Sequence, residues 1–230
     1  SCFESSASGG VYLMTNSQSL NISETHIINT SGTFQDFTGT LYGGDGVQLG
    51  AANVSLSDSS VSRYARLVLS ATDLETRFGV NPWSGPAVLE VSATGTFELM
   101  TKLTSPSGLI SNTNCVRSNN VQNLEGQDSD NFTYIRFINA GSDTITGLRA
   151  TLYDSGGDII GAESTEVIST LAPKQAVWIN RNHATDLFGA WNGEATLEVE
   201  ADHLPDLKLI NLNFVNNETF FNFSCYESGQ

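Results

Sequence analysis

Two nine-residue stretches, WSGPAVLEV at 83–91 and WNGEATLEV at 191–199, share tryptophan, glycine and alanine, followed by leucine, glutamate and valine. Toward the end of each stretch apolar residues recur at every second position, which is the period of a β-strand with one buried face. A turn that contains glycine precedes both strands. One strand-forming segment is therefore present twice, 108 residues apart.

The match continues on both sides of these stretches, with matched segments 108 to 111 residues apart. It includes Thr40-Leu41-Tyr42 with Thr151-Leu152-Tyr153, Leu67–Leu69 with Val177–Ile179, Phe78-Gly79 with Phe188-Gly189, and Cys115 with Cys225. Small slips in spacing fall in loops, where insertions are tolerated. Such a repeat predicts two homologous domains, 1–118 with an N-terminal extension and 119–230. We expect the polar segment 116–130 to be a linker or a solvated first strand.

Short alternating segments separated by turns fill each repeat. In the second repeat the expected strands are 134–138, 151–153, 176–179, 196–200, 207–212 and 219–223. One brief helix is expected in each repeat, at 70–78 and 182–188, because each segment begins with a capping residue and ends at a glycine. Long crossovers of a parallel sheet are absent. We predict an all-β fold of two tandem immunoglobulin-like β-sandwich domains, each with one short connecting helix.

Composition limits the function. The 230 residues include 25 acidic and 10 basic side chains, a net charge of −15, which argues against a nucleic-acid partner. No apolar run approaches the roughly 20 residues of a membrane helix, so we predict no transmembrane segment. The first residues lack the features of a signal peptide, and we expect a mature chain. Abundant short uncharged polar residues favour an extracellular or cell-surface location.

A resemblance to known proteins rests on the order of these motifs. TLY, then DLETRFG or HATDLFG, then W-x-G-x-A-x-L-E-V and a last strand with asparagine and cysteine together resemble tandem immunoglobulin-like β-sandwich repeats of secreted bacterial surface proteins. The likeness spans nearly the whole chain. It implies a surface location and a role as spacer, adhesive unit or assembly part, and it leaves chemistry open.

Three cysteines, Cys2, Cys115 and Cys225, lie near the start, middle and end of the chain. If each repeat closes through its own disulfide, both repeats need Cys115 and one thiol is left over. One interpretation is a head-to-tail assembly into a fibre, with Cys2 of one copy near the end of its neighbour. The alternatives are a longer tandem array that continues before Cys2, and one internal disulfide with a buried free thiol.

The segment Val11, Tyr12, Leu13 and Met14 is strand-like and precedes what reads as the repeat's own first strand at 26–29. An extra strand can pair with an exposed sheet edge of a neighbouring copy, or it can fold onto its own domain. The first possibility predicts self-association, and binding to another surface protein is a related expectation.

Calcium is the one metal that the sequence suggests, because the second half is rich in carboxylates. We choose Glu125, Asp128 and Asp130 as its ligands, although this segment lacks the glycine and the terminal glutamate of a calcium loop. The pairs Asp154 with Asp158 and Asp202 with Asp206 are weaker candidates. Turn formation on an acidic surface is the alternative for all of them. We expect no other cofactor.

Catalytic motifs are absent from the sequence, so we expect no enzyme. His183 and Asp186 fall in the expected second helix, but His183 has no counterpart in the first repeat. The matched Trp83 and Trp191 suggest packing. Polysaccharide binding by an adhesin module is the alternative function, with candidate aromatic residues Tyr12, Tyr42, Tyr64, Tyr153 and Trp178.

Overall fold

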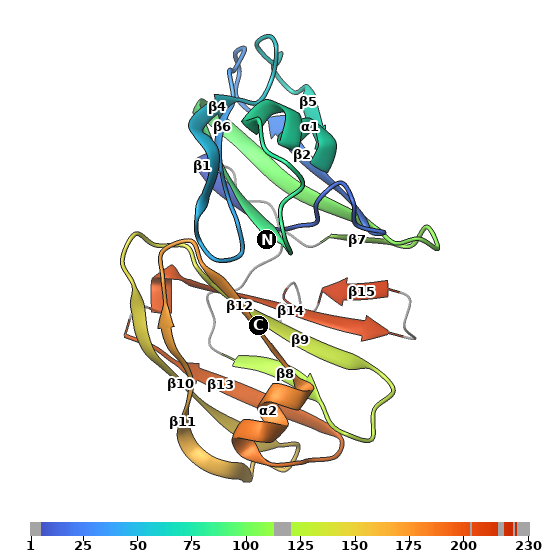
Figure 1. Ribbon diagram of the computed structural model, residues 1–230, viewed down its shortest axis with the longest axis vertical. Helices are drawn as coiled ribbons and strands as arrows, with labels where there is room; N and C mark the ends of the chain where they lie inside the picture. Colours follow the sequence, from blue (N-terminus) through green and yellow to red (C-terminus); the bar gives the residue numbers. More distant parts are fainter. Residues whose placement is uncertain (1–5, 113–120, 203, 216–218, 223, 225–230) are drawn as a thin grey trace. The chain divides into compact units, whose positions relative to one another are not determined.

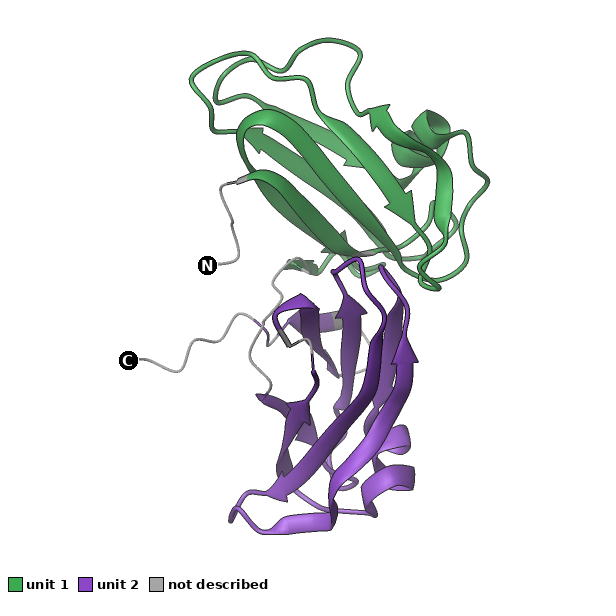
Figure 2. Cartoon of the chain, turned by 90° about the vertical axis from the view of Figure 1, so that its left-hand side faces the viewer, with its two compact units in different colours: residues 1–115 green, residues 116–230 purple. Residues whose placement is uncertain are grey.

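The computed structural model describes residues 6–112, 121–202, 204–215, 219–222 and 224. The chain divides into two compact units, residues 1–115 and 116–230 (Figure 2). Strands dominate both units and every strand pair is antiparallel, so the protein is all-β (Figure 1). Among the described residues, no helix is long and apolar enough to cross a membrane.

In the described part of the first unit, seven strands form a single hydrogen-bonded network around one long strand. The strands are β1 (Ser6–Met14), β2 (Ile22–Asn29), β3 (Thr38–Tyr42), β4 (Gln48–Ser55), β5 (Arg66–Ser70), β6 (Ala87–Thr104) and β7 (Ile110–Asn112). The first half of β6 lies between β1 and β3, and its second half between β2 and β7. Because the two halves have different neighbours, β6 contributes to two layers. Buried apolar side chains from both layers form one core.

The described residues of the second unit form two separate four-stranded sheets, β11-β10-β13-β8 and β12-β9-β14-β15. Their strands are β8 (Val121–Glu125), β9 (Phe132–Asn139), β10 (Ile145–Asp154), β11 (Ile159–Leu171), β12 (Ala176–Asn180), β13 (Glu194–Glu200), β14 (Leu207–Val215) and β15 (Thr219–Asn222). Leu152 and Leu197 of one sheet and Phe137 and Leu209 of the other belong to the same core. The unit is therefore a β-sandwich with its core between the sheets.

The strand order is the same in both units. In the second unit the turn η1 (Leu204–Asp206) separates β13 from β14, which together occupy the position of β6. Likewise β8 pairs with β13 as β1 pairs with the first half of β6. The expectation of an extra strand in the first repeat was therefore wrong: β1 has a counterpart, and it belongs to the repeat. Sequence reasoning also missed β11, a mostly exposed edge strand that lacks regular alternation.

Both expected helices are confirmed, as α1 (Ala71–Phe78) and α2 (Arg181–Phe188). Ser70 caps α1 by accepting a hydrogen bond from the backbone N–H of Asp73, and the Asp73 carboxylate accepts bonds from Ser70 in return. These bonds lower the pKa of Asp73 below its ordinary value. Asn180 caps α2 because its side chain accepts a hydrogen bond from the backbone N–H of His183. Gly79 ends α1 with a left-handed backbone conformation. The local capping signals thus fix both helices.

Candidate functional site

A small cavity of about 80 Å³ lies in the second unit, where β8 meets β9 and β14. It is lined by Asn123, Leu124, Glu125, Thr133, Glu194, Asn211 and Asn213. Six of these seven side chains are polar or acidic, whereas buried apolar side chains form the hydrophobic core of this unit. The composition of this lining makes the cavity our candidate site.

The polar end of the core follows from the register of β14. Leu207 and Leu209 point into the core, and Asn211 and Asn213 continue the same face because they stand at alternate positions. Asn211 is 3% exposed and Asn213 is 5% exposed. Two core-facing positions therefore carry amides where the earlier part of the strand carries leucines.

Hydrogen bonds fix the orientation of both amides. The Asn211 Nδ2 donates to the carbonyl oxygen of Asn123 at 2.8 Å, and the Asn213 Nδ2 donates to Glu125 Oε1 at 3.3 Å. In addition, the backbone N–H of Glu125 donates to Thr133 Oγ1 at 3.1 Å. Because the acceptors fix the position of Nδ2 in each side chain, they also fix the orientation of each amide, with Oδ1 at the opposite end. Both Oδ1 atoms are buried, and neither has a hydrogen-bond partner among the residues that the structure describes.

Two carboxylates complete the lining. Glu125 on β8 and Glu194 on β13 are directly paired across the antiparallel ladder. Like charges at such positions repel each other. No described residue of the lining is a lysine or an arginine. The cavity thus collects carboxylate and amide oxygens without a cationic side chain of its own.

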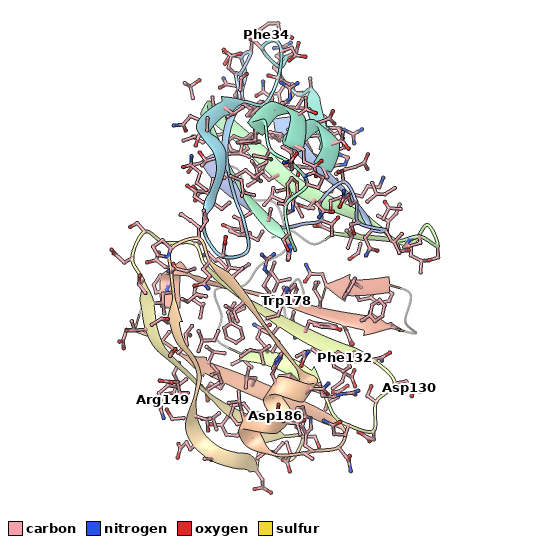
Figure 3. All side chains as sticks on the ribbon, in the orientation of Figure 1. Phe34, Asp130, Phe132, Arg149, Trp178 and Asp186 are labelled. Atoms are coloured by element: carbon pink, nitrogen blue, oxygen red, sulfur yellow. The ribbon has the colours of Figure 1, made fainter. Side chains whose placement is uncertain are left out.

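The structure does not gather the three predicted calcium ligands into one set. Glu125 lines the cavity, whereas Asp128 Oδ1 accepts a hydrogen bond from the backbone N–H of Gly193 at 2.7 Å. Asp130 is exposed on the loop between β8 and β9 (Figure 3). Across the described residues, no three acidic, histidine or cysteine side chains are close enough to share a metal ion.

An arginine holds the loop in which Asp128 and Asp130 lie. Arg181, the first residue of α2, donates from Nη1 to the carbonyl oxygens of Gly126, Ser129 and Asn131 at 2.6, 2.8 and 3.2 Å. Its guanidinium also lies 4.8 Å from the Phe132 ring. Three carbonyl oxygens of this loop therefore already face a positive charge. Sequence reasoning missed this contact because Arg181 is 50 residues or more from its partners.

Asp154, one of the weaker calcium candidates, stabilises a turn. Asp154 Oδ1 accepts hydrogen bonds from the backbone N–H groups of Gly156 and Asp158, at 2.8 and 2.9 Å. This side chain closes the β10–β11 hairpin as an Asx turn. Both residues of the Asp202 and Asp206 pair are exposed.

The predicted assembly strand lies in β1. Val11 pairs with Leu89 and Met14 pairs with Ala87, and both Val11 and Met14 are buried. Tyr12 and Leu13 belong to the same strand. In this structure the segment thus follows the second alternative and pairs within its own unit. Cys2, Cys115 and Cys225 lie outside the described residues.

The candidate aromatic residues are dispersed. Trp83 and Trp191 are buried in the cores of their units, as packing predicts. Trp178 is half-buried on the outer face of β12, 5.9 Å from the Tyr134 ring and 5.6 Å from the Arg136 guanidinium (Figure 3). Burial lowers the pKa of Arg136 to about 9. Tyr42 and Tyr153 are half-buried strand residues.

Two strongly exposed aromatic side chains lie on neighbouring loops of the first unit. Phe34 is 67% exposed and Tyr64 is 71% exposed. The loops are joined by a bridge between Gln35 and Val61, and Asn29 Nδ2 donates to backbone carbonyls of both. Phe34 projects from the end of its loop (Figure 3). The sequence pointed to Tyr64 but not to Phe34, whose only signal is an isolated aromatic residue within a polar segment.

The potential catalytic pair does not form a site. His183 and Asp186 are both exposed on α2, and Figure 3 shows Asp186 on this helix. Neither side chain lines the cavity described above. We therefore derive no chemistry from them.

Comparisons with known proteins do not define a family. No family model and no curated protein matches the chain. Among solved structures, a crystal structure of red sea bream transglutaminase is similar with a TM-score of 0.25 and 14% identity. This match covers 92% of this chain and 31% of the transglutaminase chain, so the chain spans about a third of that protein's length. So low a TM-score supports no functional argument.

Proposed function

We propose that the protein is a non-enzymatic structural module of the extracellular space or cell surface, built from two tandem immunoglobulin-like sandwiches. The observation that carries this proposal is that polar residues at repeated positions serve the fold. Asn29 and Asn139, for example, are fully buried and bind the backbone of the loops that follow β2 and β9. A scaffold is expected to repeat such an interaction, in which a buried polar side chain holds the same loop in each unit.

Head-to-tail assembly into a fibre is the specific role that we propose for this module. The supporting observation is the position of β1, which covers one side of the first half of β6 and inserts Val11 and Met14 into the core. Exchange of such a strand between copies would keep the same pairs and the same buried side chains. An intermolecular disulfide between Cys2 and Cys225 would then join successive copies.

Non-reducing electrophoresis of native material tests the assembly. We expect a ladder of covalent oligomers in the wild-type chain, because every copy would offer Cys2 at one end and Cys225 at the other. Cys2→Ser and Cys225→Ser variants should each lose the ladder. Mixed together they should yield a covalent dimer and nothing larger, since each variant keeps only one of the two linking thiols.

The matched control is Cys115→Ser, which should keep the ladder. A wild-type protein that stays monomeric in sedimentation experiments, with its thiols accounted for within one chain, would defeat the assembly. Ladders that survive in both terminal variants would show that the linkage is a different one.

Binding of a polysaccharide or another surface protein is a second candidate function, and it is favoured by Phe34 and Tyr64. Exposed aromatic rings on neighbouring loops offer stacking surfaces for sugar rings. The equivalent positions of the second unit carry Thr144 and Lys174, so only the first unit has this pair. We infer that a ligand would bind at this end of the first unit.

Glycan arrays test this second candidate. We expect binding by the wild-type chain, and a loss of about two- to tenfold in affinity for Phe34→Ala and for Tyr64→Ala, since one stacked ring contributes about 0.5–1.5 kcal/mol. Phe221→Ala is the control, because Phe221 is 52% exposed but belongs to the second unit. Uniformly negative arrays would count against a sugar ligand. Equal losses of affinity in all three variants would count against a binding site at Phe34 and Tyr64.

A further inference from the structure

We propose that the cavity between β8 and β14 binds a hard divalent cation, with Ca²⁺ as the best match. Its ligands would be the carboxylates of Glu125 and Glu194 and the amide oxygens of Asn211 and Asn213. This site differs from the one predicted from sequence, because only Glu125 is common to both. It does not depend on the assembly proposed above.

The buried amide oxygens are the first argument. Asn211 and Asn213 both line the cavity and are at least nine-tenths buried, and within the described part of the chain both Oδ1 atoms lack a hydrogen-bond partner. A buried acceptor without a partner is unfavourable, and native proteins rarely leave two side by side. Their amide nitrogens are held by Asn123 and Glu125, so the oxygens cannot be exchanged for donors by a flip.

The carboxylate pair is the second and independent argument. Glu125 and Glu194 stand opposite each other on adjacent strands and both line the cavity. A water molecule could donate to the amide oxygens, but it would leave the repulsion between the two carboxylates in place. A cation satisfies both sets of oxygens at once. Arg181 holds the loop that follows Glu125, but it is not among the residues that line the cavity.

The donor atoms select the type of cation. Carboxylate and amide oxygens are the usual protein ligands of Ca²⁺, which tolerates irregular geometry and six to eight ligands. Mg²⁺ requires a tighter octahedron and keeps more of its water. The described residues of the lining include no histidine or cysteine, which most transition metals prefer. A bound Ca²⁺ would connect β8 and β13 of one sheet to β14 of the other.

Calorimetric titration of the chelator-treated full chain with CaCl₂ tests the proposal. We expect one site per chain and an unfolding temperature that rises with Ca²⁺ concentration. Glu194→Gln should weaken Ca²⁺ binding at least tenfold, because it removes one of two charged ligands. Glu194 is exposed, so this variant should fold. Without Ca²⁺ its unfolding temperature should equal or exceed that of the wild type, because the like-charge pair is gone.

The matched control is Glu166→Gln, which makes the same charge change at an exposed position of β11 and should leave Ca²⁺ binding unchanged. Glu125→Gln, which removes the other charged ligand, should also weaken Ca²⁺ binding. Absence of calcium-dependent heat and stabilisation in the wild type would overturn the proposal. So would equal affinities of the Glu194→Gln and Glu166→Gln variants. These measurements use reduced monomer, so their outcome is independent of whether the chain assembles.

Discussion

Gly161→Ala is expected to lower the free energy of unfolding of the second unit by about 3–5 kcal/mol. Gly161 lies in β11 with φ of +76°, a left-handed backbone that disfavours side chains. An added Cβ would also overlap the carbonyl oxygen of Phe188, at the end of α2. Backbone atoms on both sides must move to relieve this overlap. Chemical denaturation, monitored with probes that distinguish the unfolding of the two units, measures the loss of free energy.

Gly157→Ala is the control that separates the overlap from the backbone conformation. Gly157 has φ of +87°, but nothing lies within 4 Å of an added Cβ. We expect this variant to lose only about 1 kcal/mol. The first unit shows the same arrangement, because a Cβ added at Gly50 would overlap the carbonyl oxygen of Phe78. A Cβ added at Gly79 would have no atom within 4 Å. Equal losses for Gly161→Ala and Gly157→Ala would contradict the close approach of helix and strand.

Asn29→Ala is expected to destabilise the first unit by about 3–4 kcal/mol. The Asn29 Nδ2 donates to the carbonyl oxygens of Thr33, Val61 and Ser62, at 2.8 to 3.1 Å. Its Oδ1 accepts from the backbone N–H and the hydroxyl of Ser31. Alanine would remove all five bonds and leave several partners without a substitute. Denaturant unfolding of the full chain measures the loss.

Two further variants make the Asn29 result specific. Asn29→Asp should be at least as harmful, because it removes the donors and places a negative charge against carbonyl oxygens. Asn81→Ala, at an exposed position of the same unit, should change stability by less than about 0.5 kcal/mol. A loss near 1 kcal/mol for Asn29→Ala would mean that water replaces the amide and that the two loops do not depend on it.

Local sequence signals accounted for the strands with one clearly apolar face and for both helices. The strand that follows Trp191 alternates apolar and polar residues, and Ser70 and Gly79 delimit α1 through short-range hydrogen bonds. By contrast, β11 escaped recognition as a strand, and for the segment that contains β8 a linker remained the alternative to a solvated first strand, because edge strands need little apolar surface. Their existence depends on backbone pairing with partners distant in sequence.

The candidate site shows the same division. Glu125 attracted attention as part of an acidic segment, but its neighbours in the cavity, Glu194, Asn211 and Asn213, are 69 to 88 residues away. An asparagine on an alternating strand does not reveal whether it faces solvent or core. Only the register of β14 against β9 places Asn213 on the inner face. The charge composition therefore drew attention to carboxylates, and the sheet pairing determined which oxygens line one cavity.

Local patterns were enough to show that one strand motif occurs twice and to locate the turns and helix caps, because these signals depend on residues a few positions apart. Three features became visible only in the folded chain: β1 belongs to the repeat, Arg181 holds the 126–131 loop, and two glutamates and two buried amides line one cavity. Antiparallel pairing and side-chain contact between distant strands create these features, and no local pattern encodes such contacts.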